Sequence, residues 1–338
     1  MLPSRLFRVR SALLVAAVFA LAGCAAPAAP ASPGDPAPGT RTVTHERGEV
    51  EVPVVPDRVV ALDEYAALNL LTAGIEPVAV FGGLSSEVGA EVLAARGIDV
   101  TPAPTMIVSP DLEAIAATRP DVVVLTSSGA ALDRTYPELS RIAPTVVVPF
   151  EGPWRAPLEL VGRAFDRDDS VGRTLAALDR RVADLAADPA EPVHSISVLG
   201  SFQNLLYSPA PPNPGSQVLA AAGFGRPQPE LAAASGASAS TVPVSPETLG
   251  GHDADVVVVL DGSIYDADAV AAVPTFGSLP AVRDGRTARA NGEMWSGGTA
   301  LATWWLLDDL ATLAGGGTAL GTPADAAARM AALEAAAR

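Results

Sequence analysis

The chain has 338 residues, of which 49% are hydrophobic, and its formal net charge is −16. This acidic balance argues against a nucleic-acid-binding protein, because phosphate binding depends on clustered lysine and arginine and the sequence contains no lysine. The single cysteine excludes a disulfide framework, and the three widely separated histidines lack metal-ligand spacing, so we predict no metal site.

The N-terminus has the pattern of a bacterial lipoprotein signal peptide. Three arginines in the first ten residues precede an apolar stretch over 12–22, which is too short to span a bilayer. The small residues Leu21-Ala22-Gly23 then stand directly before Cys24. We therefore predict a signal peptide over 1–23 and an acylated Cys24 that anchors the protein at the outer face of the cytoplasmic membrane. The alternative is an ordinary secretory signal with a free thiol.

The segment 24–41 is predicted to be a flexible tether. It consists almost entirely of alanine, proline, glycine, serine and aspartate, a composition that cannot bury a core. The folded body is expected to begin near Thr42, which leaves about 300 residues, enough for two lobes with their own cores. The later apolar stretches are short and interrupted by charge, so we predict no transmembrane helix after the leader.

Buried strands alternate with helices through the first half of the body. Short β-branched runs predict strands over 59–62, 78–81, 122–125 and 146–148, covered on both faces as in a parallel sheet. Helices are predicted over 64–73, 87–96 and 109–118. Gly74 and Gly97 end the first two, and Pro120 stops the third. This alternation is typical of an α/β lobe.

A second set of strands is predicted over 195–199, 256–260 and 287–290. Between the two sets, apolar residues recur at helical spacing over about 168–187, which predicts one helix of about 30 Å. We therefore expect an α/β fold with mainly parallel sheets in two lobes, 42–165 and 191–338, joined by a single linker helix within 166–190. Such a stiff joint implies small lobe movements. An ordinary core helix within one continuous domain is the alternative.

An internal repeat relates the two halves. The segments 109–124 and 245–258 each begin with Ser-Pro, which predicts an N-cap and first turn of a helix, and each carries a glutamate in that turn. In each segment seven residues separate the glutamate, Glu113 or Glu247, from the sequence Asp-Val-Val-Val. Each lobe is therefore expected to present one carboxylate at a helix N-terminus, where the helix dipole favours its charged form.

These and other segments resemble the class III substrate-binding lipoproteins of ABC importers, which serve ferric siderophores, haem and cobalamin. The resembling segments are a hairpin signal around Arg47-Gly48, then 56–62 (PDRVVAL), 74–78 (GIEPV), 110–115 (PDLEAI), 136–139 (YPEL), 142–146 (IAPTV), 216–219 (SQVL) and 279–285 (LPAVRDG). The resemblance implies that Glu113 and Glu247 dock onto arginines of a permease, which works with an ATPase. It also implies a monomeric binding protein with its ligand in a cleft between the lobes.

Residues at the carboxyl ends of the predicted strands are candidates to line that cleft. Aromatic rings with an arginine suit a bulky organic chelate better than a bare ion. The candidates are Tyr65, Trp154, Arg155, Phe202, Tyr207 and Trp295. Trp304 and Trp305 lie within a helical apolar pattern and are predicted to be core residues instead.

A ferric siderophore is the favoured ligand, and no cofactor is expected. An acidic body with one cleft arginine fits a hydroxamate slightly better than a strongly anionic catecholate. Haem is less favoured because no axial histidine follows a strand, although Tyr65 or Tyr207 offers an iron ligand, and cobalamin remains open. A haem-storing or haem-sensing lipoprotein is a further alternative. We find no catalytic motif, so a surface chelatase is the only enzyme alternative.

Overall fold

The structure is a computed structural model that describes residues 39–82, 86–101, 110–126, 131–150, 152–187, 193–232 and 240–338. The described residues form one compact unit. Cys24 and the predicted signal peptide lie outside the described residues. An antiparallel hairpin, β1 (Thr40–His45) with β2 (Gly48–Pro53), opens the body, so regular structure starts two residues before the predicted boundary.

The N-terminal lobe has a five-stranded parallel sheet in the order β5-β4-β3-β6-β7. Its strands are β3 (Val59–Ala61), β4 (Ala79–Phe81), β5 (Val100–Thr101), β6 (Val122–Thr126) and β7 (Thr145–Val148). Its helices are α1 (Glu64–Thr72), α2 (Glu87–Ala95), α3 (Leu112–Ala117), α4 (Ala131–Leu139) and α5 (Ala156–Ala164). The predicted strands and the helices α1, α2 and α3 are confirmed, within a few residues at their ends.

The C-terminal lobe repeats this strand order as β10-β9-β8-β11-β12. Its strands are β8 (Ile196–Phe202), β9 (Leu205–Pro209), β10 (Thr241–Pro243), β11 (Val256–Asp261) and β12 (Thr287–Asn291). Strands β8, β11 and β12 are parallel, but β9 is antiparallel to both neighbours. The reason is the two-residue turn between β8 and β9, where Gln203 and Asn204 both have positive φ, which matches a tight hairpin turn.

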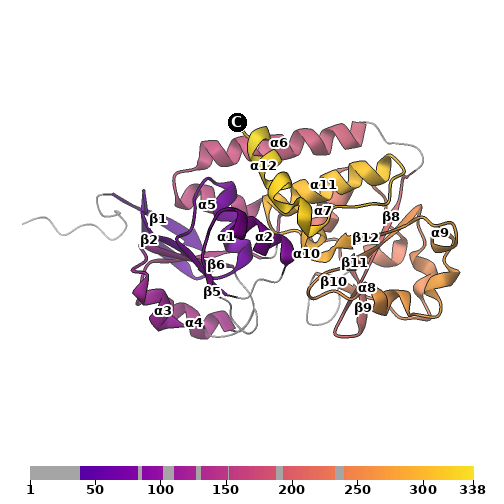
Figure 1. The fold of residues 1–338 in the computed structure, drawn as a ribbon, viewed down its shortest axis with the longest axis horizontal. Helices are drawn as coiled ribbons and strands as arrows, with labels where there is room; N and C mark the ends of the chain where they lie inside the picture. The colour runs from indigo at the N-terminus through magenta and orange to yellow at the C-terminus, as the bar shows by residue number, and fades with distance from the viewer. Residues whose placement is uncertain are drawn as a thin grey trace, which may run out of the picture. The chain divides into compact units, whose positions relative to one another are not determined.

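Helices of the second half complete the body (Figure 1). The α-helices are α6 (Asp168–Ala187), α7 (Pro214–Ala221), α8 (Ala267–Ala271), α9 (Pro280–Arg283), α10 (Gly292–Ser296), α11 (Ala300–Ala314) and α12 (Ala326–Ala336). The 3-10 helices are η1 (Gln228–Leu231), η2 (Leu249–His252), η3 (Phe276–Ser278) and η4 (Pro323–Asp325). The predicted linker helix is confirmed as α6, which contacts α5 of the first lobe and α7, α11 and α12 of the second half.

One hydrophobic core runs through both lobes on the side of α6. Alternate residues of the central strands face this shared core, as Val59 and Ala61 do in one sheet and Val256 and Val258 do in the other. The intervening residues face separate clusters on the opposite face of each sheet. The shared core restricts lobe movement, because separating the lobes would expose packed apolar surface.

The C-terminal helix crosses back to the first lobe. Helix α12 packs against α2, and Glu334 forms an ion pair with Arg96 of the helix α2 C-cap. Helix α12 also contacts α6, α11 and η4, so the end of the chain packs against elements of both lobes. Sequence order gave no sign of this packing.

Candidate functional site

The first half of the candidate ligand site lies at the start of α1. Asp63 caps this helix by accepting a hydrogen bond from the Ala66 amide at 2.8 Å, and it also accepts from the amide of Thr126 at 2.6 Å and from its hydroxyl at 2.7 Å. These bonds tie the carboxyl ends of β3 and β6 together. They fix Tyr65, whose buried ring meets the half-exposed ring of Phe150 edge to face at 5.3 Å.

Tyr65 lies against the C-terminal lobe. A Cβ atom at Gly298, between α10 and α11, would stand 3.6 Å from the Tyr65 ring. The neighbouring Asn69 donates a hydrogen bond of 3.3 Å to the Gly298 carbonyl. The start of α1 is therefore part of the junction between the two lobes.

The second half of the site comes from β9 and the segment after β11. The Tyr207 ring lies over Gly200 of β8, where a Cβ atom would stand only 2.8 Å from Cζ of the ring. The ring of Tyr265 is 6.5 Å away, and its hydroxyl shares a hydrogen bond of 2.7 Å with Ser296 Oγ. Both tyrosines are partly exposed. They were brought together by the β8–β9 hairpin, which places Tyr207 inside a strand rather than in a loop after one.

Burial keeps these two phenols protonated. It raises the pKa of Tyr265 to about 12. Burial, followed by the neighbouring Tyr265, Glu293 and Tyr65, raises the pKa of Tyr207 well above its ordinary value. The influence of Tyr65 on Tyr207 connects the two halves of the site. Neutral phenols donate and accept hydrogen bonds.

Two buried carboxylates, one from each lobe, complete the arrangement. Glu64 in the first turn of α1 accepts hydrogen bonds from the amide and hydroxyl of Ser86 at 2.9 and 2.6 Å. Glu293 in α10 is fully buried and accepts a long bond of 3.4 Å from the Ile264 amide, and its Oε2 has no partner among the described residues. Burial and the charge of Glu64 raise the pKa of Glu293 to about 7. We call Glu64, Tyr65, Tyr207, Tyr265 and Glu293 the seam cluster.

An apolar hairpin tip lies on the same face of β9 as Tyr207. Phe202 and Leu205 are a cross-strand pair, and they are 43% and 70% exposed. Since Gly200 and Tyr207 form the next pair on that face, the tip extends the aromatic surface of the seam cluster. The predicted site residues Tyr65, Phe202 and Tyr207 therefore belong to one region.

The other three predicted ligand residues have other partners. The Arg155 guanidinium stacks 4.3 Å from the Trp154 ring centre and pairs with Asp179 of α6. The adjoining Gly152 carbonyl accepts a bond from Gln217 of α7 at 3.0 Å, so this loop packs beside α6 and α7. Trp295 is 2% exposed, and its Nε1 donates to Asp309 at 2.8 Å. Trp295 is thus a core residue, and its assignment to the ligand site was wrong. Trp304 and Trp305 are core residues as predicted.

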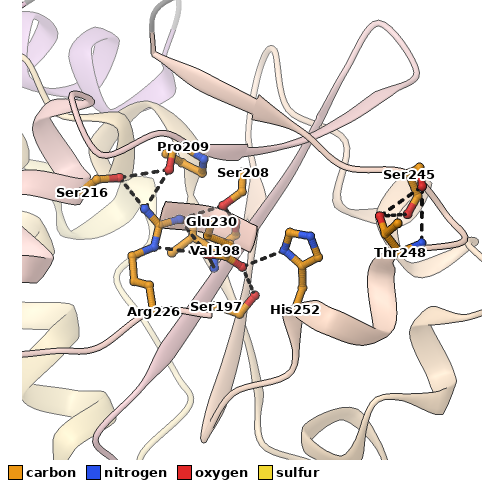
Figure 2. Close-up of polar contacts among 10 residues, drawn as sticks. All are labelled: Ser197, Val198, Ser208, Pro209, Ser216, Arg226, Glu230, Ser245, Thr248 and His252. Carbon is orange, nitrogen blue, oxygen red and sulfur yellow. Dashed lines mark hydrogen bonds and ion pairs between the residues drawn. The ribbon is translucent and has the colours of Figure 1, made fainter. Parts of the chain in front are cut away.

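Glu113 and Glu247, the predicted docking residues, are both exposed. Glu113 lies in the first turn of α3, which is capped by Asp111 through a bond of 2.9 Å from the Ala114 amide. The predicted cap, Ser109, lies outside the described residues. Glu247 lies in a turn before η2 rather than in an α-helix, and Ser245 accepts a bond of 3.3 Å from the Thr248 amide there (Figure 2). Hydrogen bonds from its own amide and from Ser245 lower the pKa of Glu247.

The internal repeat is real in three dimensions. Asp121, before β6, accepts bonds of 2.7 and 2.9 Å from the amides of Asp57 and Arg58. Asp255, before β11, accepts bonds of 2.9 and 2.8 Å from the amides of His194 and Ser195. Each aspartate thus fastens the segment that enters the central strand of its sheet. The repeated Asp-Val-Val-Val motif is a structural unit that sets the register of two neighbouring strands.

A buried polar network lies in the same lobe as the turn from Ser245 to Thr248 (Figure 2). Glu230 accepts bonds from Arg226 Nη2 at 2.7 Å and Ser197 Oγ at 2.6 Å, and it meets His252 Nδ1 at 3.1 Å. The guanidinium also donates to the Pro209 carbonyl and to two serine hydroxyls. This network fixes η1 and η2 against β8. The sequence did not reveal this network, because its residues are far apart along the chain and form no recognisable motif.

No group of three or more potential metal-ligating residues occurs in the described part of the chain. Within the same segments, no helix is both long and apolar enough to cross a membrane.

Comparisons with known proteins agree with this architecture. The family model described as "Periplasmic binding protein" matches residues 85–292. A Bacillus subtilis protein, "Probable siderophore-binding lipoprotein YfiY", is 26% identical over 88% of this chain and 94% of its own length. The ferric enterobactin-binding periplasmic protein FepB of Escherichia coli is 28% identical over 52% of this chain and 58% of its own.

Solved structures share the fold. SirA of Staphylococcus aureus, in complex with staphyloferrin B, superimposes with a TM-score of 0.67 at 21% identity, covering 82% of this chain and 98% of SirA. The catecholate-siderophore binding protein VctP of Vibrio cholerae gives 0.63 at 22% identity, covering 81% and 99%. With a family model that spans most of the body and a two-lobed α/β fold, the chain belongs to the periplasmic binding protein family, as a substrate-binding protein of the class III type.

Proposed function

We propose that this protein is an extracytoplasmic solute-binding lipoprotein that captures a ferric siderophore between its lobes and delivers it to an ABC permease and its ATPase. The observation that carries the proposal is the seam cluster, in which the buried Tyr65 of the first lobe packs against Gly298 of the second, and the partly exposed Tyr207 and Tyr265 lie near the carboxyl ends of β8 and β11. Aromatic faces and neutral phenols suit an organic chelate. The names of YfiY and FepB, both siderophore-binding proteins, support the same ligand class.

The proposed ligand contacts are Tyr65, Tyr207 and Tyr265, with Phe150, Phe202 and Leu205 at the edges. Removal of one aromatic contact of this kind is expected to cost about 1.4 kcal/mol of binding free energy, which is a tenfold increase in Kd. Iron(III) chelates absorb light and quench protein fluorescence, so binding is measured by titration of the leaderless protein. Saturable quenching by a ferric siderophore, without such a response to free ferric ion, is expected.

A matched pair of variants tests the location. Tyr207→Ala is expected to weaken binding about tenfold or more. Tyr136→Ala, in α4 and packed 5.7 Å from the His45 ring, removes the one tyrosine outside the seam and is expected to leave Kd unchanged. Equal effects of the two changes would contradict the proposed site. A Soret band shift with haem, in the absence of siderophore binding, would indicate that the ligand is haem and not a siderophore.

Glu113 and Glu247 are proposed to dock onto arginines of the permease. Exposed ion pairs contribute only about 0.2 to 1 kcal/mol each, so two of them orient a transient encounter rather than hold a tight complex. The proposed acyl chains on Cys24 keep the protein close to the permease and raise its local concentration there. This arrangement suits a carrier that has to dissociate after delivery.

Uptake of a radiolabelled iron siderophore by cells tests the docking residues. The double variant Glu113→Ala, Glu247→Ala is expected to reduce uptake while ligand affinity in vitro stays unchanged. The double variant Glu87→Ala, Glu138→Ala removes the same charge from two other exposed positions and serves as the matched control. A loss of ligand affinity in the first variant, or equal uptake defects in both, would show that the docking assignment is wrong.

A further inference from the structure

We propose that the chelate carried by this protein has no net negative charge, so that its class is the neutral or cationic iron(III) hydroxamates rather than the anionic catecholates. This inference rests on the proposed function and specifies its substrate. The relatives do not decide the question, because the ligands in their names and titles differ, from a catecholate siderophore to staphyloferrin B, and the solved structures are only 21–22% identical to this chain. The decision therefore depends on the charges of this chain's own seam cluster.

The fixed charges at the seam are negative. Glu64 and Glu293 approach from opposite lobes closely enough that the charge of one affects the ionisation of the other. The groups that face Glu293 from the surrounding elements are Glu64 on α1, Tyr207 on β9, and Tyr265 with the amides of Ser263 and Ile264 after β11. Each of these groups is an acid, a neutral phenol or a backbone dipole. A negative chelate placed here would meet like charge in a desolvated setting.

Positive charge is held elsewhere. Arg289, near the carboxyl end of β12, pairs with both Asp261 and Asp268. Arg155, predicted as the cleft cation, is neutralised by Asp179 and stacked on Trp154. Arg226 is buried in its own network with Glu230. A tris-catecholate complex of iron(III) carries several negative charges and needs such cations, whereas a hydroxamate complex does not.

The uncharged surface of the seam also fits a hydroxamate. The protonated phenols of Tyr207 and Tyr265 donate hydrogen bonds to carbonyl and N–O oxygens. The exposed pair of Phe202 and Leu205 offers apolar contact to the methylene chains that link hydroxamate groups. The buried Oε2 of Glu293, which has no partner among the described residues, belongs to the same cluster, and its ionised form attracts positive charge.

The pH dependence of chelate binding measures the effect of the charge on Glu293. Because the pKa of Glu293 is about 7, the ionised fraction of this carboxyl rises from about one tenth at pH 6 to about nine tenths at pH 8. A cationic chelate that favours the ionised form gains up to about tenfold in affinity over that interval. A neutral chelate changes little, and an anionic chelate loses affinity as the pH rises.

Three ferric chelates applied to the leaderless protein test the inference: ferrioxamine B, which carries a protonated amine, neutral ferrichrome, and anionic ferric enterobactin. Ferrioxamine B and ferrichrome are expected to bind at least about tenfold more tightly than ferric enterobactin. Ferrioxamine B is further expected to bind more tightly at pH 8 than at pH 6. Glu293→Gln should abolish this pH dependence, and Glu138→Gln, an exposed control, should preserve it.

The affinity ranking of the unmodified protein does not depend on how the variants fold. Ferric enterobactin binding as tightly as the hydroxamates, or more tightly, would overturn the charge inference while the proposed function stands. Binding of ferrioxamine B that weakens as the pH rises would also overturn it. If none of the three chelates binds, this inference fails; the proposed function fails with it if ferric staphyloferrin B, named in the SirA complex, does not bind either.

Discussion

Replacing Glu230 with glutamine tests how the C-terminal lobe holds its buried polar network. The change keeps the size of the side chain but removes the charge opposite Arg226, whose side chain is 3% exposed. Glu230 accepts five hydrogen bonds, from Ser197 Oγ, the Val198 amide, Nε and Nη2 of Arg226, and His252 Nδ1. Removing one partner of a buried ion pair leaves an uncompensated charge and costs about 3 to 5 kcal/mol.

The expected loss is large enough to measure by urea or thermal unfolding followed by circular dichroism. For a folded body of about 300 residues, 3 to 5 kcal/mol corresponds to a decrease in Tm of roughly 5 to 8 °C. The double variant Arg226→Met, Glu230→Met replaces the pair by apolar side chains. It is expected to be more stable than the Glu230→Gln variant, because no buried charge is left unpaired. Glu138→Gln is the exposed control.

The same network predicts a response to acid. Burial alone would raise the pKa of Glu230, but the hydrogen bond from His252, the charge of Arg226 and the hydrogen bond from Ser197 outweigh burial and lower it. A lowered carboxyl pKa stabilises the fold at pH above the ordinary value of 4.5, and this stabilisation is lost as the pH falls below it. The Glu230→Gln variant should therefore lose less stability in acid than the unmodified protein. A loss below about 1 kcal/mol at neutral pH, or a double variant less stable than Glu230→Gln, would refute the reasoning.

Three further predictions concern other parts of the fold. Asp121→Ala and Asp255→Ala should each lower the free energy of unfolding by about 1 to 3 kcal/mol, and unequal losses in urea unfolding would argue against equivalent roles. Trp295→Phe should cost about 2 kcal/mol through its lost hydrogen bond to α11 but leave siderophore affinity unchanged, which titration of the purified variant checks. Arg155→Ala should change stability by no more than about 1 kcal/mol and should not weaken chelate binding; a tenfold rise in Kd would return this residue to the ligand site.

The predicted secondary structure was confirmed where a local pattern decides it. Continuous β-branched runs became the central strands β3, β6, β8 and β11, and the long amphipathic stretch became α6. The β8–β9 hairpin was missed. Its turn has no glycine and uses Gln203 and Asn204 with positive φ instead. The tight-turn signal expected from sequence is an Asn-Gly or Asp-Gly pair, which is absent there.

The candidate site was predicted less well, because it depends on which face of an element each side chain occupies. Glu293 and Trp295 are two positions apart in α10, and two steps along a helix rotate a side chain by roughly 200°. The carboxylate therefore lies in the seam cluster, whereas the indole packs against Asp309 of α11. The sequence analysis chose Trp295 as a ligand contact because its ring suits an organic chelate, but the sequence did not show which way the side chain points.

By itself the sequence determined the buried central strands, the helices α1, α2 and α3, the duplicated Asp-Val-Val-Val unit and the linking helix, since each depends on short-range periodicity and capping. Only the tertiary structure decided that α12 packs against α2 of the first lobe and that Tyr65 lies against Gly298 of the second. It also decided that Arg155 is paired with Asp179, and that Glu64 and Glu293 are buried at the seam. These contacts join residues far apart along the chain, and packing of the shared core across both lobes brings them together.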